Sequence, residues 1–374
     1  MEKVIKCFDC GDMVSRNDIS ECNHCGEDFC DSCFSGESCG NCDDHFCSES
    51  CLDRHNGEYH NDNDDDDNNR SDTTIIVRPY SSAKIFRSDN EGKEIRSKRI
   101  YGVEIEAYYP DREAGNAVQD ELPRGVGVTT DGSINHRNGF EIQTTKLAGT
   151  KGEKVLKNIC EIVNSNGCKV EASCGLHLHI DGKGIVGSVI AQKLLWQFYA
   201  VVDDILMGFL PKSRRQNKFC IRLLRKAGID EIGKCGSQDM LEQLWYKLDN
   251  LQEIRQIKNG KYHDTRYYGV NLHSLFANGH YEVRYHSGTT NFMKISQWAN
   301  LHLRIADAVI SKTDDMEMFI NTVLSMPDMQ EKRNAMYKFL ELNDEEIKYW
   351  EKRWSLFSPV SEKGEELLIA VKKQ

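Results

Sequence analysis

The chain has 374 residues, of which 39% are hydrophobic and 29% charged, and its formal net charge is −11. This length is enough for one large or two ordinary domains. No apolar run approaches the roughly 20 residues that a bilayer-spanning helix needs, and the N-terminus lacks the apolar stretch of a secretory signal. We therefore expect a soluble, intracellular protein of the cytoplasm without a membrane partner.

Charge and cysteine content divide the chain into unlike parts. Residues 1–70 hold 19 Asp and Glu against 5 Lys and Arg, and ten of the fifteen cysteines lie between Cys7 and Cys51. Cysteines this dense would suggest disulfides in a secreted domain, but in an intracellular chain they indicate metal. We predict a small multi-zinc domain at 1–60, an acidic linker and lead-in at 61–97, and a larger domain at 98–374.

The cysteine spacing predicts closed zinc sites. A C-x2-C turn presents two thiolates to one tetrahedral ion, and two such pairs complete a structural site. The arrangement resembles treble-clef and cross-brace fingers of the RING, B-box and ZZ type without matching any one of them, and its pairing stays open. Two to three structural Zn²⁺ ions would be held by Cys7, Cys10, Cys22, Cys25, Cys30, Cys33, Cys39, Cys42, Cys47, Cys51, His55 and His60.

The acidity of residues 1–70 bears on the partner of this zinc module. Binding to nucleic acid depends on neutralising phosphates, which an acidic module cannot do. Two roles remain open. The zinc ions could stabilise the fold of a segment with little hydrophobic core, or the module could be a docking site for a protein partner. The run from Asn61 to Asn69 is too polar to bury apolar surface, and its acidic residues repel one another, which predicts an extended linker.

Beyond residue 98, short strands alternate with helical segments, which predicts an α+β fold. Strict alternation over 100–108 and 174–180 places aliphatic side chains on one strand face and Glu104, Glu106, His177 and His179 on the other. Segments 281–286 and 270–273 repeat the pattern. These polar faces carry carboxylates, imidazoles and arginine, which is the chemistry of a divalent-ion and phosphate site.

Helices are expected over 152–165, ending at Asn166–Gly167, over 185–210 and over 238–256, with several more from 293 to about 357. Trp298, Leu301, Leu303 and Ile305 should face the core.

A series of segments, in the family's own order, resembles the amidoligase family of the carboxylate–amine ligase superfamily. Gly102–Glu106 is similar to its first catalytic strand, and Thr130–Ile134 with Gly139–Ile142 to the next two. Cys174–His179 is similar to its histidine strand. The remaining likenesses are Ser213–Cys220 to its basic loop, and Arg266–Leu272 and Glu282–Thr289 to its last two motifs. Gln143-Thr144-Thr145-Lys146 stands where the family usually has Ser-Pro, a departure that bears on the local turn and on a substrate contact there.

The resemblance implies a glutamine-synthetase-like curved antiparallel sheet with flanking helices, whose concave face holds ATP and Mg²⁺ or Mn²⁺. It implies an ATP-dependent ligase that joins a carboxylate to an amine through an acyl-phosphate. The fused zinc module suggests that one of the two substrates is carried by a peptide or protein. The implied metal ligands are Glu104, Glu106, Glu141, His177 and Glu282. Arg284, Asp131 and Arg266 are implied as catalytic residues, and Arg214, Arg215 and Asn271 as nucleotide or substrate contacts.

Two alternatives remain. His177 and His179 on one strand could instead present two imidazoles to zinc in a metal-dependent hydrolase, which would leave the acidic set and the arginines without a role. The RING-like spacing could belong to an interaction adaptor or ubiquitin-type ligase. No motif identifies the carboxylate or the amine.

Overall fold

The computed structural model describes residues 78–358 except 216, 261 and 262, together with the N-terminal pieces 4–7, 13–15, 19–21, 28–30, 37–38 and 45–46. The chain forms two compact units, Met1–Asp72 and Thr73–Gln374. No helix in the described part of the chain is long and apolar enough to cross a membrane.

The described pieces of the N-terminal unit form three antiparallel strand pairs. They are β1 (Val4–Lys6) with β2 (Met13–Ser15), β3 (Ile19–Glu21) with β4 (Asp28–Cys30), and β5 (Glu37–Ser38) with β6 (His45–Phe46). In sequence, a C-x2-C pair lies between the two strands of each. Cys7 and Cys30 are both buried, and the Cys30 amide donates to Cys7 Sγ at 3.4 Å. The other ten predicted zinc ligands lie outside the described residues, so the zinc module stays a prediction.

Within residues 78–358, the described part of the larger unit is built on an eight-stranded sheet. Its central order is β13-β14-β12-β8-β10-β9, all antiparallel, while β11 pairs with β8 and, in parallel, with β7. The strands are β7 (Ile85–Arg87), β8 (Tyr101–Tyr108), β9 (Gly127–Thr129), β10 (Gly139–Gln143), β11 (Lys146–Ala148), β12 (Gly175–Asp181), β13 (Val270–Asn271) and β14 (His280–Ser287). The fold is therefore α+β, as the sequence predicted.

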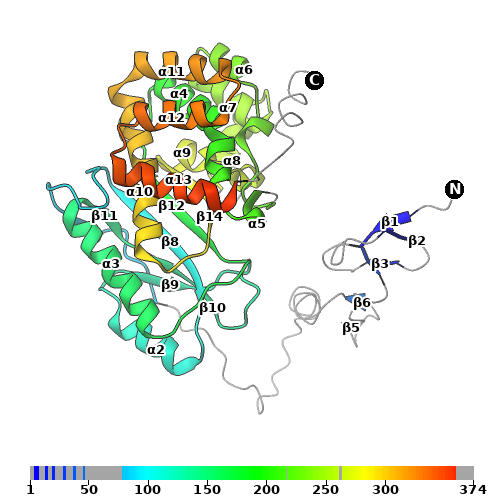
Figure 1. Ribbon diagram of the computed structural model, residues 1–374, viewed down its shortest axis with the longest axis vertical. Helices are drawn as coiled ribbons and strands as arrows, with labels where there is room; N and C mark the ends of the chain where they lie inside the picture. The colour runs from blue at the N-terminus through cyan, green and yellow to red at the C-terminus, as the bar shows by residue number, and fades with distance from the viewer. Residues whose placement is uncertain are drawn as a thin grey trace. The chain divides into compact units, whose positions relative to one another are not determined.

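Helices surround this sheet. Figure 1 shows α2 and α3 beside the β8–β10 half, whereas α4, α6, α7, α11 and α12 gather beyond the opposite end. The helices are α2 (Arg112–Glu121), α3 (Gly149–Ser165), α4 (Val189–Gly208), α5 (Lys212–Arg215), α6 (Ile229–Lys234), α7 (Gln238–Tyr246), α8 (Leu251–Lys258), α9 (Leu272–Asn278), α10 (Phe292–Ser311), α11 (Thr313–Ser325), α12 (Met329–Phe339) and α13 (Asp344–Phe357), with 3₁₀ turns η2 (Leu223–Arg225) and η3 (Asp264–Tyr267).

Alternation of side chains gives the sheet one apolar and one polar face. On β8, Val103, Ile105 and Ala107 are fully buried and belong to the main core, together with Leu156 of α3 and Trp298 of α10. Burial of such aliphatic side chains contributes about 1.5–3 kcal/mol each. The apolar face therefore anchors the strands and fixes the register that positions the polar face.

Residues 78–97, expected as a lead-in, pair with this sheet. Arg78 forms an antiparallel bridge with Val128, and its guanidinium donates to the carbonyls of Gln119, Leu122 and Pro123. Further along, the buried Glu153 carboxylate of α3 accepts the amides of residues 93–95. Since unpaired backbone groups are costly to bury, these contacts tie the segment to the larger unit.

Most predicted helices are confirmed. The helix expected at 152–165 is α3, which ends at Ser165 with Asn166 as its C-cap and Gly167 at φ 69°. The four core positions expected on α10, from Trp298 to Ile305, are fully buried.

Two expectations were wrong. The helix expected over 238–256 is two helices, because Lys247 is left-handed at φ 54° and Asn250 caps α8. The strand expected over 270–273 ends at Asn271, whose side chain caps α9. His273 is thus helical and bonds Tyr246 Oη at 2.7 Å, away from the polar face of the sheet.

Candidate functional site

Strand register brings the polar side chains together on one face. His177 of β12 lies opposite Glu104 of β8, and Glu141 of β10 lies opposite Glu106. On the other side of β12, His179 lies opposite Glu282 of β14. Directly opposed residues on one face have Cβ atoms about 5 Å apart, so residues remote in sequence form one cluster.

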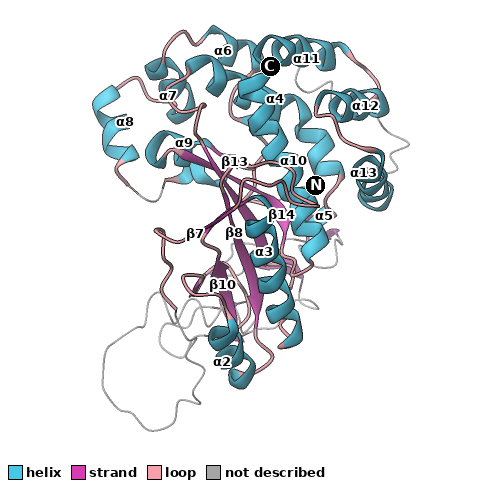
Figure 2. Ribbon diagram, turned by 90° about the vertical axis from the view of Figure 1, so that its left-hand side faces the viewer, coloured by secondary structure: helices cyan, strands magenta, loops and turns pink. Residues whose placement is uncertain are grey.

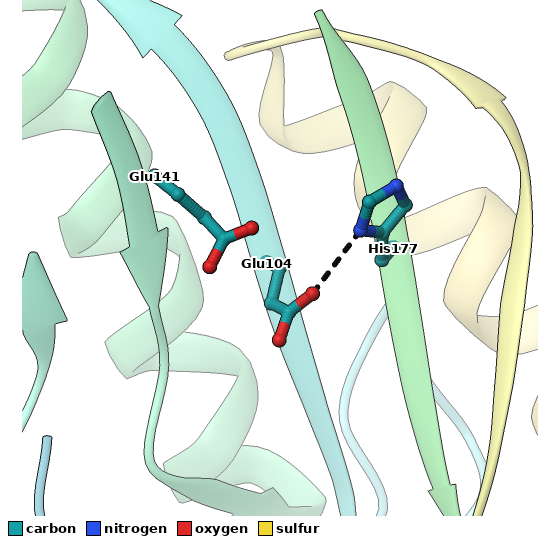
Figure 3. Close-up of side chains that lie close together, drawn as sticks. All are labelled: Glu104, Glu141 and His177. Carbon is teal, nitrogen blue, oxygen red and sulfur yellow. Dashed lines mark hydrogen bonds and ion pairs between the residues drawn. The ribbon is translucent and has the colours of Figure 1, made fainter. Parts of the chain in front are cut away.

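His177 lies at the centre of this cluster. Its Nδ1 is 3.1 Å from Glu104 Oε2 and 3.5 Å from Glu282 Oε1, and its Nε2 is 3.5 Å from Glu106 Oε1. Figure 3 shows the Glu104 carboxylate between His177 and Glu141, each on its own strand. One imidazole therefore touches carboxylates from two neighbouring strands.

Gly175 permits this close packing. Its amide donates to Glu106 Oε2 at 2.6 Å, and a Cβ at this position would lie 3.0 Å from His177 Nε2. Any larger residue would push the imidazole away from the carboxylates.

Three overlapping groups within the described residues could hold cations. Within each group, ligand atoms lie within 4.8 Å of one another. The groups are Glu104–Glu141–His177, Glu104–His179–Glu282 and Glu106–Asp131–Glu141. Each has at most one imidazole, and its other donors are carboxylate oxygens, which suits Mg²⁺ or Mn²⁺ better than Zn²⁺. The donor set therefore fits the divalent ions that the sequence led us to expect.

Burial and repulsion by neighbouring carboxylates raise the pKa values of Glu141 and Glu106. Burial raises the pKa of Glu141 to about 9, with a further contribution from the charge of Glu104, although Gln143 Nε2 donates to Glu141 Oε1 at 2.8 Å. Burial also raises the pKa of Glu106. A pKa of about 9 keeps the Glu141 carboxyl protonated at neutral pH, and a bound cation would favour its ionised form.

Glu104 and Glu282 have partners whose attraction outweighs the cost of burying a carboxylate charge. Although burial opposes ionisation, His179 and His177 hold the pKa of Glu104 well below its usual range, and Arg284 lowers the pKa of Glu282. Burial alone would lower the pKa of His179, but the carboxylate of Glu104, 3.1 Å away, raises it to about 9. Ion pairs thus hold the cluster together.

Arg284 stands on a β-bulge at the edge of the cluster. Between β12 and β14, Leu176 pairs with His286 and Leu178 with Val283, so Arg284 and Tyr285 together face His177. Bulges of this kind re-aim side chains and are common beside active sites. The Arg284 guanidinium pairs with Glu282 through Nη1 and donates through Nε to the Phe219 carbonyl at 3.4 Å.

The other predicted contacts have partners of their own. Asn271 Nδ2 donates to Glu282 Oε2 at 2.8 Å. Arg214 is buried and donates to two carbonyls of β14, and Arg215 Nη2 donates to the Leu210 carbonyl at 3.3 Å. Arg266 packs on the Tyr267 ring and donates to its hydroxyl. Their contact with nucleotide or substrate stays a prediction.

The family resemblance did not place His179 among the Mg²⁺ or Mn²⁺ ligands, and His179 entered only as a zinc ligand of the hydrolase alternative. Its alternation with His177 was the sequence signal that places both imidazoles on one strand face. The hydroxyl of Thr144, where the family usually has Ser-Pro, accepts the Val103 amide at 2.8 Å. Thr144 therefore pairs with β8 at the break between β10 and β11.

A family model described as a putative amidoligase enzyme matches residues 70–306, nearly two thirds of the chain. The chain therefore belongs to this amidoligase family, a family of ligase-type enzymes. No curated protein matches it. The match includes residues 78–97 and the whole cluster, and excludes residues 1–69 and helices α11–α13.

Proposed function

We propose that this protein is an ATP-dependent ligase that joins a carboxylate to an amine through an acyl-phosphate. The observation that carries the proposal is the set of three overlapping carboxylate and imidazole groups beside Arg284, on one face of the sheet of an amidoligase-family chain. Phosphoryl transfer needs mainly positioning and neutralisation of charge, and this cluster offers both.

The proposed metal ligands are Glu104, Glu106, Glu141, His177 and Glu282, with His179 as a sixth. Divalent ions held there would neutralise charge on the phosphates of ATP. Buried carboxylates that repel one another favour such ions, because a cation removes both the repulsion and the cost of burying charge.

In the proposed reaction, an oxygen of the substrate carboxylate attacks the γ-phosphorus of ATP and ADP leaves. The amine then attacks the acyl carbon, inorganic phosphate leaves, and the nitrogen loses a proton. Among the described residues, Arg284 Nη2 has no hydrogen-bond partner, so this donor is available to the transferred phosphoryl group. Asp131 Oδ1 accepts from Ser133, which leaves Oδ2 to hold the amine.

The hydrolase alternative has less support. A zinc hydrolase would place several imidazoles on one ion, yet His177 and His179 fall in different candidate groups, each surrounded by carboxylates. The arginine beside these carboxylates would also have no role in it.

For the N-terminal unit, we propose zinc-stabilised hairpins that dock a protein partner. The contact between Cys30 and Cys7 supports one shared ion, because thiolates of a zinc site accept backbone amides. Metal analysis of the full chain should return two to three zinc ions. Cys7→Ser and Cys30→Ser should each lose one ion, and the double variant no more than either. Loss of two ions in the double variant would show that Cys7 and Cys30 belong to separate zinc sites.

The ligase proposal is tested with the full chain, Mg²⁺ and ATP, using hydroxylamine as the amine and a panel of carboxylates. A ligase of this kind forms a hydroxamate and releases ADP and phosphate in equal amounts. Release of AMP and pyrophosphate would indicate an acyl-adenylate and contradict the mechanism. Glu282→Gln is the matched inactive control. Failure to bind MgATP by calorimetry, by a folded protein, would contradict the function itself.

A further inference from the structure

The β-bulge in β14 leaves backbone groups that the sheet cannot pair in the regular way. Arg284 and Tyr285 share a single opposing residue, His177, where a regular ladder would give each its own. A bulge interrupts the ladder locally, and a carbonyl buried there still needs a donor.

Arg214 supplies both donors. Its Nη2 donates to the Arg284 carbonyl at 2.7 Å, and its Nε donates to the Tyr285 carbonyl at 3.1 Å. Arg214 is only 3% exposed. A rigid guanidinium fork can bond two neighbouring carbonyls at once, whereas an ammonium on a flexible stem cannot hold both in one geometry.

The loop that carries Arg214 also contacts the Arg284 side chain. The Phe219 carbonyl accepts from Arg284 Nε, and the Arg214 carbonyl accepts from Cys220 Sγ at 3.3 Å. On the other side, the Arg284 amide donates to the Gly269 carbonyl at 2.8 Å. Both views show α5, which contains Arg214, beside β14 (Figures 1 and 2).

We infer that Arg214 is a positioning residue, which fixes the bulge and thereby aims the Arg284 guanidinium at the metal and phosphate site. This rests on the proposed function in assigning Arg284 its catalytic role. In this role Arg214 acts through the backbone of β14, because its Nη2 and Nε are engaged by two carbonyls of that strand in a buried setting.

A double-mutant cycle on the full chain tests this inference. Arg214→Lys keeps the charge but loses the fork, and should lower kcat about 10–100-fold with KM for ATP changed less than about threefold. Arg284→Lys should be at least as inactive. The double variant should match Arg284→Lys within about threefold, because Arg214 has nothing left to position. Losses that multiply in the double variant would show an independent role for Arg214 and overturn the inference.

Lys212→Ala is the matched control, because Lys212 is exposed on the same short helix and makes none of these contacts. It should keep wild-type kcat. If Arg214→Lys fails to fold, Arg214→Gln takes its place, since an amide can retain one of the two bonds.

A readout independent of turnover separates this inference from the ligase proposal. In proton–nitrogen spectra of ¹⁵N-arginine-labelled protein, the Nε–H signal assigned by Arg284→Lys should shift or broaden in the Arg214 variant and stay in place in Lys212→Ala. An unchanged Arg284 signal would overturn the inference, even in an active enzyme. A shifted signal in a chain without ATP turnover would support the positioning role and contradict only the ligase function.

Discussion

Glu141→Gln should stabilise the metal-free protein at neutral pH. Burial and the neighbouring carboxylates raise the pKa of Glu141 to about 9, against an ordinary value of 4.5. At pH 7 the unfolded chain therefore releases this proton and the folded chain keeps it. The folded state binds the extra proton between pH 4.5 and 9, so stability falls as pH rises through that window.

The magnitude follows from this difference. At pH 7 the unfolded carboxyl lies about 2.5 pH units above its pKa, which favours unfolding by about 3 kcal/mol. Glutamine is nearly isosteric with the protonated acid and can accept the same bond from Gln143. The variant should therefore be more stable by up to about 3 kcal/mol at pH 7, and by less than about 1 kcal/mol at pH 5.

Urea unfolding at pH 5, 6 and 7 in Mg²⁺-free buffer measures this gain. All five tryptophans lie between residues 196 and 354, so their fluorescence reports the larger unit alone. Glu317→Gln, at an exposed glutamate on α11, is the control and should change stability by less than about 0.5 kcal/mol. Mg²⁺ should then stabilise the wild type more than Glu141→Gln, which loses a ligand of two of the three candidate groups. A Glu141→Gln protein that is less stable at pH 7 than the wild type would refute the reasoning.

Three further predictions follow from the same geometry. Glu282→Gln should lower turnover by at least about 100-fold while the protein stays folded, because it removes a ligand charge from a strand held by its apolar face. Near-normal ATP turnover would exclude Glu282 as a ligand. Mg²⁺ binding at pH 7.5 should release about one proton, so the calorimetric heat of binding should depend on the ionisation enthalpy of the buffer. Glu141→Gln should abolish this dependence. Lys226→Met should stabilise the fold by about 1–2 kcal/mol, because burial beside Trp245 and Tyr268 lowers the pKa of Lys226 to about 8. Urea unfolding should show the full gain in stability below pH 8, and the gain should disappear towards pH 10.5.

The sequence predicted the polar face well, because a strand has a period of two. Once Val103 and Ile105 are assigned to the core, Glu104 and Glu106 must share the opposite face, and the same reasoning pairs His177 with His179. The order of strands does not follow from periodicity. It required the register between β8, β10, β12 and β14, which depends on pairs far apart in sequence, such as Gly175 with Ser287.

Features built on local irregularity were the ones that sequence reasoning missed. Asn271 looks like a strand residue, yet its side chain caps α9 and takes His273 out of the sheet. The bulge at Arg284 leaves no trace in the hydrophobic pattern, since Val283 and Tyr285 both remain buried as alternation requires. Arg214 could be recognised as basic, but only the fold shows that its partners are carbonyls.

The boundary of the larger unit yields a last prediction. A fragment beginning at residue 73 should fold and keep Mg²⁺ binding, whereas a fragment beginning at residue 98 should be destabilised or insoluble. The shorter fragment loses the bridge between Arg78 and Val128 and the three hydrogen bonds of the Arg78 guanidinium. It also loses the three amides that donate to the buried Glu153 carboxylate. An uncompensated buried carboxylate alone costs several kcal/mol.

Glu153→Gln in the longer fragment is the matched test, because glutamine offers one acceptor oxygen where the carboxylate offers two. It should lower the melting temperature of the longer fragment, and its effect in the shorter fragment should be small or stabilising. If the fragment from residue 98 melts at the same temperature as the fragment from residue 73, residues 78–97 do not stabilise the sheet. Pairing of this segment with the sheet would then be a consequence of the fold and make no contribution to its stability.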